Sequence, residues 1–347
     1  PQDRSWRLRY RIDGVLSTIR LPHRAESAHR AVVSSTKVMA QVDIAEHRLP
    51  QDGRFSVTID ERELDLRVSV LPAQHGEAIV MRILNRESSL INLDHIGWTE
   101  DQLQVMRRFL AISNGIVLFT GPTGSGKTTS LYAALSALND EHRKIVTIED
   151  PVEYEIKGTT QLQVNAVIGF TFTTGLRSVL RHDPDVILIG EIRDLETARI
   201  AMRSAMTGHL VFSTLHTNDS PSALLRLLEM GVEAYLVAAS VRGVVAQRLV
   251  RQICPRCRRE KAVEPWVEAQ MRTLCPENTD LVTLLYGEGC PDCRFTGYQG
   301  RAAIFEILEM TDALREHVVT RPSAATLMES ARAAGLVTLL ECGWSKV

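Results

Sequence analysis

The sequence predicts an α/β protein whose largest part is a mostly parallel sheet with helices on both faces. Short apolar runs rich in β-branched residues alternate with helix-forming stretches from residue 103 onward. Such alternation is typical of a parallel sheet whose two faces are both covered. A glycine-rich segment, GPTGSGKTT (121–129), joins one of these runs to a helix-forming stretch. Two Cys-x-x-Cys pairs lie in a later segment that is richer in Cys, Pro, Arg and Gly.

Residues 1–86 are expected to form a separate, small α/β unit. WRLRYRIDGVL alternates as a strand does, whereas HRAVVSSTKVMAQVDIAEH has the pattern of a helix. RFSVTID and ELDLRVSVLP alternate again, with turn signals at QDG and DER. The polar stretch that follows, 87–102, is expected to be a linker.

Residues 103–347 carry the predicted core. Strands are expected at 116–120, 144–149, 185–190 and 209–215, and helices at 127–139, about 173–182, 194–207 and about 221–230. A cysteine-bearing subdomain is expected at 250–300. Residues 311–347 have the pattern of short helices, broken at Pro322 and Gly335.

The bulk composition is that of an ordinary globular protein. Hydrophobic residues make up 44% of the 347 residues, charged residues 24%, and the net charge is −2. This balance creates no overall field that favours nucleic acid or membrane. No apolar run approaches the roughly 18 residues of a membrane helix, and no secretory signal is visible. Because the sequence begins at Pro1 and not at a methionine, we expect the natural N-terminus to lie upstream.

The glycine-rich segment predicts a phosphate-binding loop. Gly121–Thr128 fits G-x-x-x-x-G-K-[ST], between the apolar run GIVLFT and the helix former TTSLYAALSAL. Backbone N–H groups and a helix N-terminus favour phosphate there, and this context disfavours a turn that binds nothing. Lys127 is expected to reach the β- and γ-phosphates, and the Thr128 hydroxyl to bind Mg²⁺. The predicted nucleotide-binding residues of this loop are Gly121, Pro122, Thr123, Gly124, Ser125, Gly126, Lys127, Thr128 and Thr129.

Acidic residues follow two other predicted strands. Glu191 follows DVILIG, one residue beyond the usual position of a Walker B acid, which is Gly190 here. Glu149, Asp150 and Glu153 follow another apolar run, where they could orient water or metal beside the nucleotide. Each acid alone could be a surface residue, but the group is more convincing than its members.

Two histidines, His209 and His216, flank the strand HLVFSTL. A lone histidine is usually structural. We expect both to lie at the carboxyl edge of the sheet, where they could sense the γ-phosphate.

Four segments occur in an order and at a spacing that resemble one family. GPTGSGKTT, TIEDPVEYE, LRHDPDVILIGEIRDLETA and TGHLVFSTLHTN match the Walker A, Asp box, Walker B and His box of the GspE/PilB-type secretion and pilus ATPases. LRVSVLPAQHGEAIVMRIL resembles the domain before the ATPase, and AQRLVRQICPRC and CPDCRFTGYQGRAAIFEIL resemble the metal-binding insertion. The resemblance therefore covers nearly the whole chain and is closest to the type II secretion type. It implies a RecA-like P-loop ATPase core, preceded by a PAS-like domain and carrying a zinc insertion and C-terminal helices.

The resemblance also implies roles for the acids and histidines. Glu153 would be the general base, with Glu149 a second choice and a nucleotide contact. Glu191 would be the Walker B acid and would share Mg²⁺ with Thr128. His216 would lie near the γ-phosphate, with His209 a weaker candidate.

Four arginines match arginines of the family. Arg67 and Arg82 would reach the nucleotide from the preceding domain as arginine fingers, and Arg177 and Arg181 would lie near the nucleotide. A guanidinium fork suits this task because it can neutralise the charge that develops during phosphoryl transfer.

The cysteine pairs are expected to form a zinc site. Cys254, Cys257, Cys290 and Cys293 could supply four thiolates, which form a closed, structural Zn²⁺ site. In a chain with no export signal, such pairs indicate a metal before a disulfide. Reduced free thiols are the alternative.

A basic cluster accompanies the first pair. Its members are Arg248, Arg251, Arg256, Arg258, Arg259 and Lys261. A solvated face is the simpler interpretation, and contact with acidic phospholipid or an acidic partner is the sharper one. No aromatic stacking platform accompanies the cluster, so nucleic acid is not expected as a partner.

The implied function is that of an ATPase motor that uses ATP, Mg²⁺ and Zn²⁺. The resemblance implies a cytoplasmic homo-hexamer, peripheral on the bacterial inner membrane, that drives pseudopilus assembly and protein export by a type II secretion system. Its partners would be an inner-membrane platform protein and cytoplasmic domains of secretion-system membrane proteins. A type IV pilus assembly motor, a nucleic-acid translocase with the same core and a small-molecule phosphotransferase remain alternatives. Retraction motors lack the tetracysteine insertion and are disfavoured.

Overall fold

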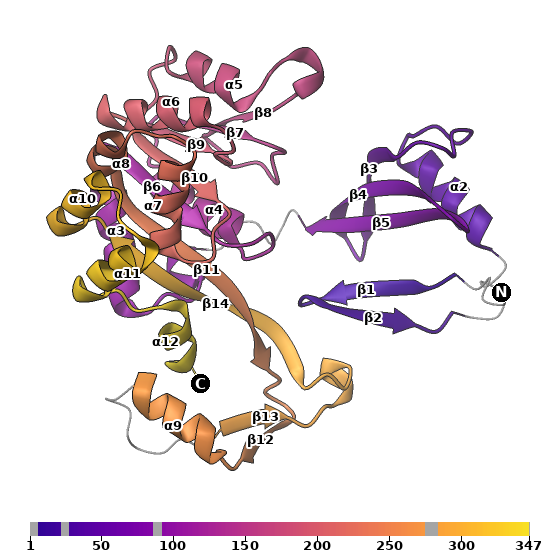
Figure 1. The fold of residues 1–347 in the computed structure, drawn as a ribbon. Helices are drawn as coiled ribbons and strands as arrows, with labels where there is room; N and C mark the ends of the chain where they lie inside the picture. Colours follow the sequence, from indigo (N-terminus) through magenta and orange to yellow (C-terminus); the bar gives the residue numbers. More distant parts are fainter. Residues whose placement is uncertain (1–5, 22–27, 86–91, 275–283, 347) are drawn as a thin grey trace. The chain divides into compact units, whose positions relative to one another are not determined.

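The computed structural model describes residues 6–21, 28–85, 92–274 and 284–346, and the chain divides into two compact units, Pro1–Ser89 and Leu90–Val347 (Figure 1). In its described residues, the first unit has a hairpin, a helix and a three-stranded antiparallel sheet in the order β3-β4-β5. Its elements are β1 (Leu8–Ile12), β2 (Val15–Ile19), α2 (His29–Met39), β3 (Gln51–Ile59), β4 (Arg62–Ala73) and β5 (Gly76–Asn85).

Tight turns set the register of the first unit. Asp13 and Gly14 both have positive φ and join β1 to β2, as the favoured two-residue hairpin turn requires. The predicted turn at DER is confirmed, because Asp60 and Glu61 join β3 to β4. The predicted turn at QDG is wrong, because these residues begin β3. Gly53 is instead required by close packing, since a Cβ there would lie 2.3 Å from the carbonyl oxygen of Ala40.

The second unit is built on a seven-stranded sheet in the order β14-β11-β6-β10-β9-β7-β8. Every neighbouring pair is parallel except β11 with β14. The strands are β6 (Gly115–Thr120), β7 (Ile145–Glu149), β8 (Thr160–Gln163), β9 (Val186–Ile189), β10 (Leu210–Leu215), β11 (Val241–Ile253) and β14 (Tyr298–Glu309). The predicted fold class, a mostly parallel sheet, is confirmed.

Helices cover both faces of this sheet, as Figure 1 shows. Side chains of β6 alternate between two cores: Ile116 and Leu118 pack on one face, Val117 and Phe119 on the other. The first core includes α5, α6, α7, α8, α10 and α11, and the second includes α3 and α4. The helices are α3 (Glu100–Ala111), α4 (Lys127–Leu138), α5 (Phe172–Val179), α6 (Leu195–Met206), α7 (Ser220–Glu229), α8 (Ala234–Ser240), α10 (Asp312–Val319), α11 (Ala324–Ala333) and α12 (Leu339–Trp344).

The predicted linker over 87–102 is wrong from residue 92 onward. Leu93 lies in the short helix η2 (Leu93–His95) and is buried. The indole of Trp98 stacks on the ring of Phe305 with 3.5 Å between the ring centroids. Thr99 then starts α3 with a capping box. The stretch is mostly polar in sequence, but its apolar residues Leu93 and Trp98 pack against the second unit.

The antiparallel pair β11–β14 extends beyond the sheet into the cysteine-bearing subdomain (Figure 1). This subdomain contains β12 (Arg258–Lys261), α9 (Pro265–Leu274), β13 (Leu284–Gly287) and the short helix η4 (Pro291–Cys293). The two shorter strands pair antiparallel with each other. One strand, β11, thus contacts β6 in the core and ends next to Cys254.

A buried carboxylate joins the C-terminal helices to the core. Glu306 on β14 accepts hydrogen bonds from the backbone N–H of Ser220 (2.7 Å) and from its hydroxyl (2.6 Å). Its other oxygen accepts from the N–H of Leu339 at 3.1 Å. A single side chain therefore caps the first residues of both α7 and α12. Among the described helices, none combines the length and the apolar character that crossing a membrane would need.

Candidate nucleotide and metal sites

The phosphate loop runs from the end of β6 into the first residue of α4. Gly121 and Gly126 have positive φ, and a Cβ on either would lie within 2.8 Å of Gln247 on β11. The loop is therefore packed closely against that strand. Ser130, in the first turn of α4, donates a buried hydrogen bond of 2.9 Å to Oε1 of Gln247. The loop and β11 are thus held together by glycine packing and by one polar link.

Lys127 is buried at the start of α4. Its Nζ donates to the carbonyl oxygens of Gly121 (2.6 Å) and Pro122 (3.2 Å). Burial lowers the pKa of Lys127, and the Glu191 carboxylate opposes that effect. Ser125 Oγ is buried and has no hydrogen-bond partner in the described part of the chain. A buried polar atom of this kind usually has a partner, and a phosphate oxygen would supply one here.

Glu191 follows β9 at the carboxyl edge of the sheet. It pairs with Arg193 at 2.5 Å and lies 3.3 Å from Nε2 of His216, which follows the adjacent strand β10. Gly190 takes the usual position of the acid, and a Cβ there would lie 3.2 Å from the carbonyl oxygen of Ile148, which accepts the Gly190 N–H. The hydrogen bond with Glu191 raises the pKa of Arg193.

The loop after β10 is tied to the strand that leads into the phosphate loop. The N–H of Thr217 donates to Oγ1 of Thr120 at 2.8 Å, and the two hydroxyls lie 2.8 Å apart. His216 is therefore held next to the carboxyl end of β6. The structure brings Lys127, Glu191 and His216 to one edge of the sheet. The hydroxyl of Thr128, on an exposed residue, and the Glu191 carboxylate offer the oxygen ligands that Mg²⁺ prefers.

The expectation that both histidines lie at this edge is wrong for His209. Leu210 pairs with Gly115 at the amino ends of β10 and β6, so His209 lies at the opposite edge, about 20 Å along the strand from the phosphate loop. Its Nδ1 lies 3.0 Å from the carbonyl oxygen of Ser204. A six-residue strand separates the two histidines, which places them at opposite ends of it.

The two glutamates of the Asp-box segment differ in environment. Glu149 is 4% exposed and accepts hydrogen bonds from Tyr132, Thr147 and Gln161. Glu153 lies four residues further on and is half-buried. The predicted cofactor contact of Glu149 is thus a side chain whose oxygens are occupied by protein donors.

Arg177 and Arg181 lie at the end of α5 and just beyond it. The guanidinium of Arg177 forms an ion pair with Glu196 in the first turn of α6. Nη1 of Arg181 donates to the carbonyl oxygen of Arg177 at 2.7 Å. Neither side chain donates to the phosphate loop within the described residues, so their predicted role near the nucleotide stays a prediction.

Arg67 and Arg82 are direct cross-strand partners on β4 and β5. The register also pairs Arg54 on β3 with Arg67, so three arginines form one row across a face of the sheet. Like charges opposite one another destabilise a sheet, which makes the row suited to an anion rather than to stability. Arg54 was missed from the sequence, although the two-residue turns would have given this register. Arg193 was missed as well, despite its position two residues after Glu191.

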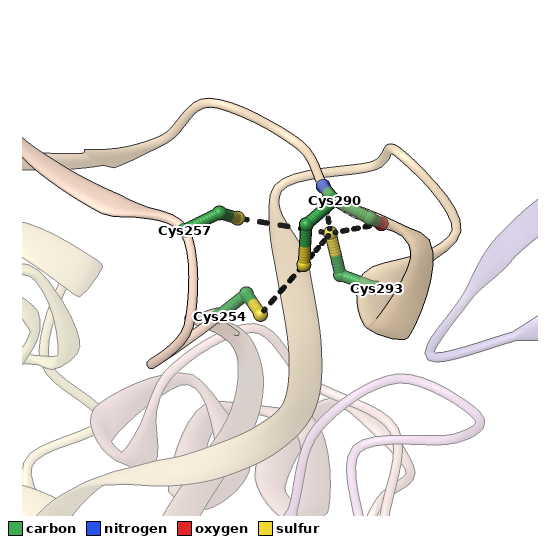
Figure 2. Close-up of side chains that lie close together, drawn as sticks. All are labelled: Cys254, Cys257, Cys290 and Cys293. Carbon is green, nitrogen blue, oxygen red and sulfur yellow. Dashed lines mark hydrogen bonds between the residues drawn. The ribbon is translucent and has the colours of Figure 1, made fainter.

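The four predicted zinc ligands converge, as Figure 2 shows. Their sulfur atoms all lie within 4.8 Å of one another. The Cys254–Cys290, Cys257–Cys293 and Cys290–Cys293 sulfurs are separated by 3.9, 3.8 and 3.8 Å. Tetrahedral Zn²⁺ with Zn–S bonds of about 2.3 Å requires S–S separations of about 3.8 Å. The arrangement therefore fits a closed four-thiolate zinc site.

Backbone N–H groups surround these sulfurs. Gly289 donates to Cys257 at 3.3 Å, and Cys290 and Gly297 donate to Cys293 at 3.1 and 3.3 Å. The hydrogen bond from Cys290 is the largest influence that lowers the pKa of Cys293, to about 6. Burial raises the pKa of Cys257 to about 12. Such N–H donors orient the ligands and support negative charge on the sulfurs.

Much of the basic cluster beside this site is already neutralised. Arg256 pairs with Asp292 at 2.9 Å, Arg259 with Glu288 at 3.3 Å, and Lys261 with Glu264 at 3.5 Å. Arg251 lies over the ring of Tyr298, and Arg248 donates to Asn218. The charge available to an acidic partner is smaller than the sequence suggests.

The chain is similar in sequence to known proteins over nearly its whole length. The family described as Type II/IV secretion system protein matches residues 1–347. The chain is 47% identical over 336 residues to Type II secretion system protein HxcR of Pseudomonas aeruginosa. The matched region covers 97% of this chain and 67% of that protein. It is 46% identical over 328 residues to Type II secretion system ATPase E of Vibrio cholerae. That matched region covers 94% of this chain and 64% of the Vibrio protein.

Solved structures show the same fold. The pilus retraction motor PilT with bound ADP has a TM-score of 0.60 at 24% identity, covering 96% of this chain and 88% of that one. The chain spans 67% and 64% of the length of the two curated relatives named above. By sequence, the chain therefore belongs to the type II/IV secretion system protein family, and its fold is similar to that of the pilus retraction motor.

Proposed function

We propose that this chain is the ATP-hydrolysing part of a type II secretion motor that works as a cytoplasmic homo-hexamer at the bacterial inner membrane. The observation that carries the proposal is the gathering of Lys127, Glu191 and His216 at one edge of the sheet, around a phosphate loop. Glu191 lies 3.3 Å from His216 and influences the pKa of Lys127. These groups follow three different strands, so their gathering is a property of the fold.

The chain's residues would divide the work of hydrolysis. The phosphate loop and Lys127 would hold the phosphates, and Thr128 with Glu191 would hold Mg²⁺, which would neutralise charge on the β- and γ-oxygens. Glu153 would take a proton from the attacking water as general base. His216, beside Glu191, would sense the γ-phosphate.

The arginine row of the first unit would complete the site. Arg67 and Arg82 would neutralise charge on the transferring phosphoryl group, and a finger of this kind can come from another domain or another subunit. Nucleotide binding would then draw the arginine-bearing unit toward a phosphate loop of the same or another subunit, and hydrolysis would release it. In a ring, this cycle would drive pseudopilus assembly and export.

The partners follow from the relatives. The curated relatives are named for type II secretion, which favours that system over type IV pilus assembly. We infer that an inner-membrane platform protein and cytoplasmic domains of secretion-system membrane proteins receive the mechanical output.

The Lys127→Ala variant tests the site. Loss of the cation that meets the phosphates should reduce the ATPase rate by about 100-fold or more, the scale seen when one charge-stabilising group is removed. The rate should be measured together with the oligomeric state, with and without a cytoplasmic domain of a membrane partner. Retained turnover would exclude the proposed site.

Mixing two inactive variants tests the ring. Arg67→Ala should also be inactive while it keeps nucleotide binding. If the arginines act between subunits, a mixture of Lys127→Ala and Arg67→Ala chains regains activity, because some interfaces combine an intact loop with an intact arginine. Each variant alone is the control, and no regain in mixed oligomers would place the arginines within one subunit.

A further inference from the structure

A buried polar network surrounds Glu149 at the carboxyl end of β7. Tyr132 on α4 donates its hydroxyl to one carboxylate oxygen. The other oxygen accepts from Oγ1 of Thr147 at 2.6 Å and from Nε2 of Gln161 at 3.2 Å. Glu149 is 4% and Tyr132 1% exposed. A base that serves a substrate needs an oxygen that faces it, whereas both oxygens of Glu149 already accept from the protein.

The same network grips the segment that carries Glu153. The N–H of Glu153 lies 3.3 Å from the Tyr132 hydroxyl, which it reaches as a donor. Gln161 donates to the carbonyl oxygen of Tyr154 at 3.1 Å and accepts from the N–H of Ile156 at 2.7 Å. The rings of Tyr154 and Tyr132 meet edge to face, with 4.5 Å between centroids. Three main-chain groups of residues 153–156 are thus bound to side chains of the network.

The network begins on the helix that binds phosphate. Tyr132 lies five residues after Lys127 on α4, so it is rigidly connected to the phosphate loop. Burial, followed by the charge of Glu149, raises the pKa of Tyr132, so its hydroxyl stays protonated and keeps donating. Burial likewise raises the pKa of Tyr154 to about 12. Glu149 thereby remains an acceptor shared by α4, β7 and β8.

We propose that Tyr132 and Glu149 are positioning residues that hold Glu153 in register with the phosphate loop, and that Glu149 is not the general base. This inference rests on the proposed ATP hydrolysis with Glu153 as the base. Tyr132 serves two partners at once: it donates to Glu149 and accepts from the backbone of Glu153. A displacement of a catalytic group by about 1 Å can cost about 100-fold in rate, so loss of this hydroxyl should act on catalysis more than on binding.

The Tyr132→Phe variant removes the hydroxyl and keeps the ring against Tyr154. We expect kcat for ATP to fall by about 10- to 100-fold, with KM and ADP affinity within about twofold. Gln161→Leu, on a neighbouring strand, should likewise lower kcat and leave KM and ADP affinity nearly unchanged. It replaces Tyr132→Phe as the test if that variant does not fold. Tyr235→Phe is the matched control, because Tyr235 is 61% exposed on α8, and its kcat should be unchanged.

Two glutamine variants separate positioning from base catalysis. Glu153→Gln should abolish turnover at every pH while nucleotide still binds. Glu149→Gln should lower kcat but leave the acidic limb of the pH profile of kcat in place, because the titrating base is still present. A merely structural role would lower thermal stability without changing the kcat of the folded fraction, and would overturn the proposal.

The outcomes distinguish this inference from the proposed function. If turnover depends on Lys127 but Tyr132→Phe and Gln161→Leu keep wild-type kcat, only the positioning role is overturned. If Glu149→Gln is inactive and Glu153→Gln is active, Glu149 is the base. If the wild-type chain shows no Lys127-dependent turnover, both proposals fail.

Discussion

The phosphate loop packs against the middle of β11, and the cysteine cluster lies at the end of that strand. The two sites differ in how their polar atoms are hydrogen-bonded. In the loop, Ser125 Oγ is buried without a partner among the described residues, and Lys127 donates to carbonyl oxygens of its own loop. In the cluster, every sulfur lies close to another sulfur, and three backbone N–H groups point at two of them.

This difference is the one expected between a site that exchanges its ligand and a site that keeps it. A hydroxyl without a partner, and a lysine that donates only to carbonyl oxygens of its own loop, can both turn to a bound nucleotide. Four thiolates with supporting N–H donors leave no position for a substrate. The cysteine cluster is therefore expected to determine the structure of the subdomain, and the loop to carry the chemistry.

The largest effect should come from breaking the cysteine cluster. Cys257→Ser should lose the zinc, expected at one ion per chain, because three thiolates and a hydroxyl bind it far more weakly. The binding free energy of structural zinc is of the order of 10 kcal/mol and contributes directly to folding. Mass spectrometry should show the lost ion, and limited proteolysis should cut between residues 254 and 298.

A cysteine outside the cluster provides the control. Cys342 is buried in α12 and belongs to another part of the fold, so Cys342→Ala should keep its zinc. A Cys257→Ser protein with one zinc per chain would contradict the contrast between the two sites.

A smaller effect should come from the link between the loop and β11. Ser130→Ala leaves Oε1 of Gln247 buried without its donor, which should cost about 1–3 kcal/mol of unfolding free energy. Urea denaturation measures this change. Ser136→Ala, in a partly exposed position on the same helix, should change it by less than about 0.5 kcal/mol. Equal values for both variants would mean that β11 does not anchor the loop.

The smallest effect is expected at the rim of the cysteine cluster. The side chains of Arg256 and Asp292 form an ion pair and are 75% and 42% exposed. Water screens such a pair, so Arg256→Ala should cost about 0.2–1 kcal/mol and leave the zinc content unchanged. Loss of zinc in this variant would show that the rim, and not only the thiolates, builds the site.

Local sequence patterns predicted most of the elements of the second unit. The helix expected at 127–139 spans 127–138, and the strand expected at 209–215 spans 210–215. The helix expected at 173–182 ends earlier, at Val179, and the chain then turns at Asp183, which has positive φ. The phosphate loop, Glu191 and the cysteine pairs were visible because their spacing in the sequence reflects one local structure each.

Partners from distant segments could not be predicted in this way. Gln247 meets Ser130 across 117 residues, and only the strand order places β11 beside β6. The prediction for His209 was wrong for a related reason. His209 and His216 flank the same strand, β10, so they lie at opposite edges of the sheet. The network around Glu149 joins α4, β7 and β8, and no single segment contains its pattern.

The buried carboxylate of Glu306 has a consequence for how the molecule opens. It accepts from the amides of Ser220 and Leu339, which are more than a hundred residues apart in the chain. Amides that share one buried acceptor are freed by the same opening event, so their hydrogen exchange should have similar protection. Fraying of α12 would then expose the start of α7, four residues after His216. The last described helix is, in this sense, one cooperative unit with the edge of the sheet where Lys127, Glu191 and His216 lie.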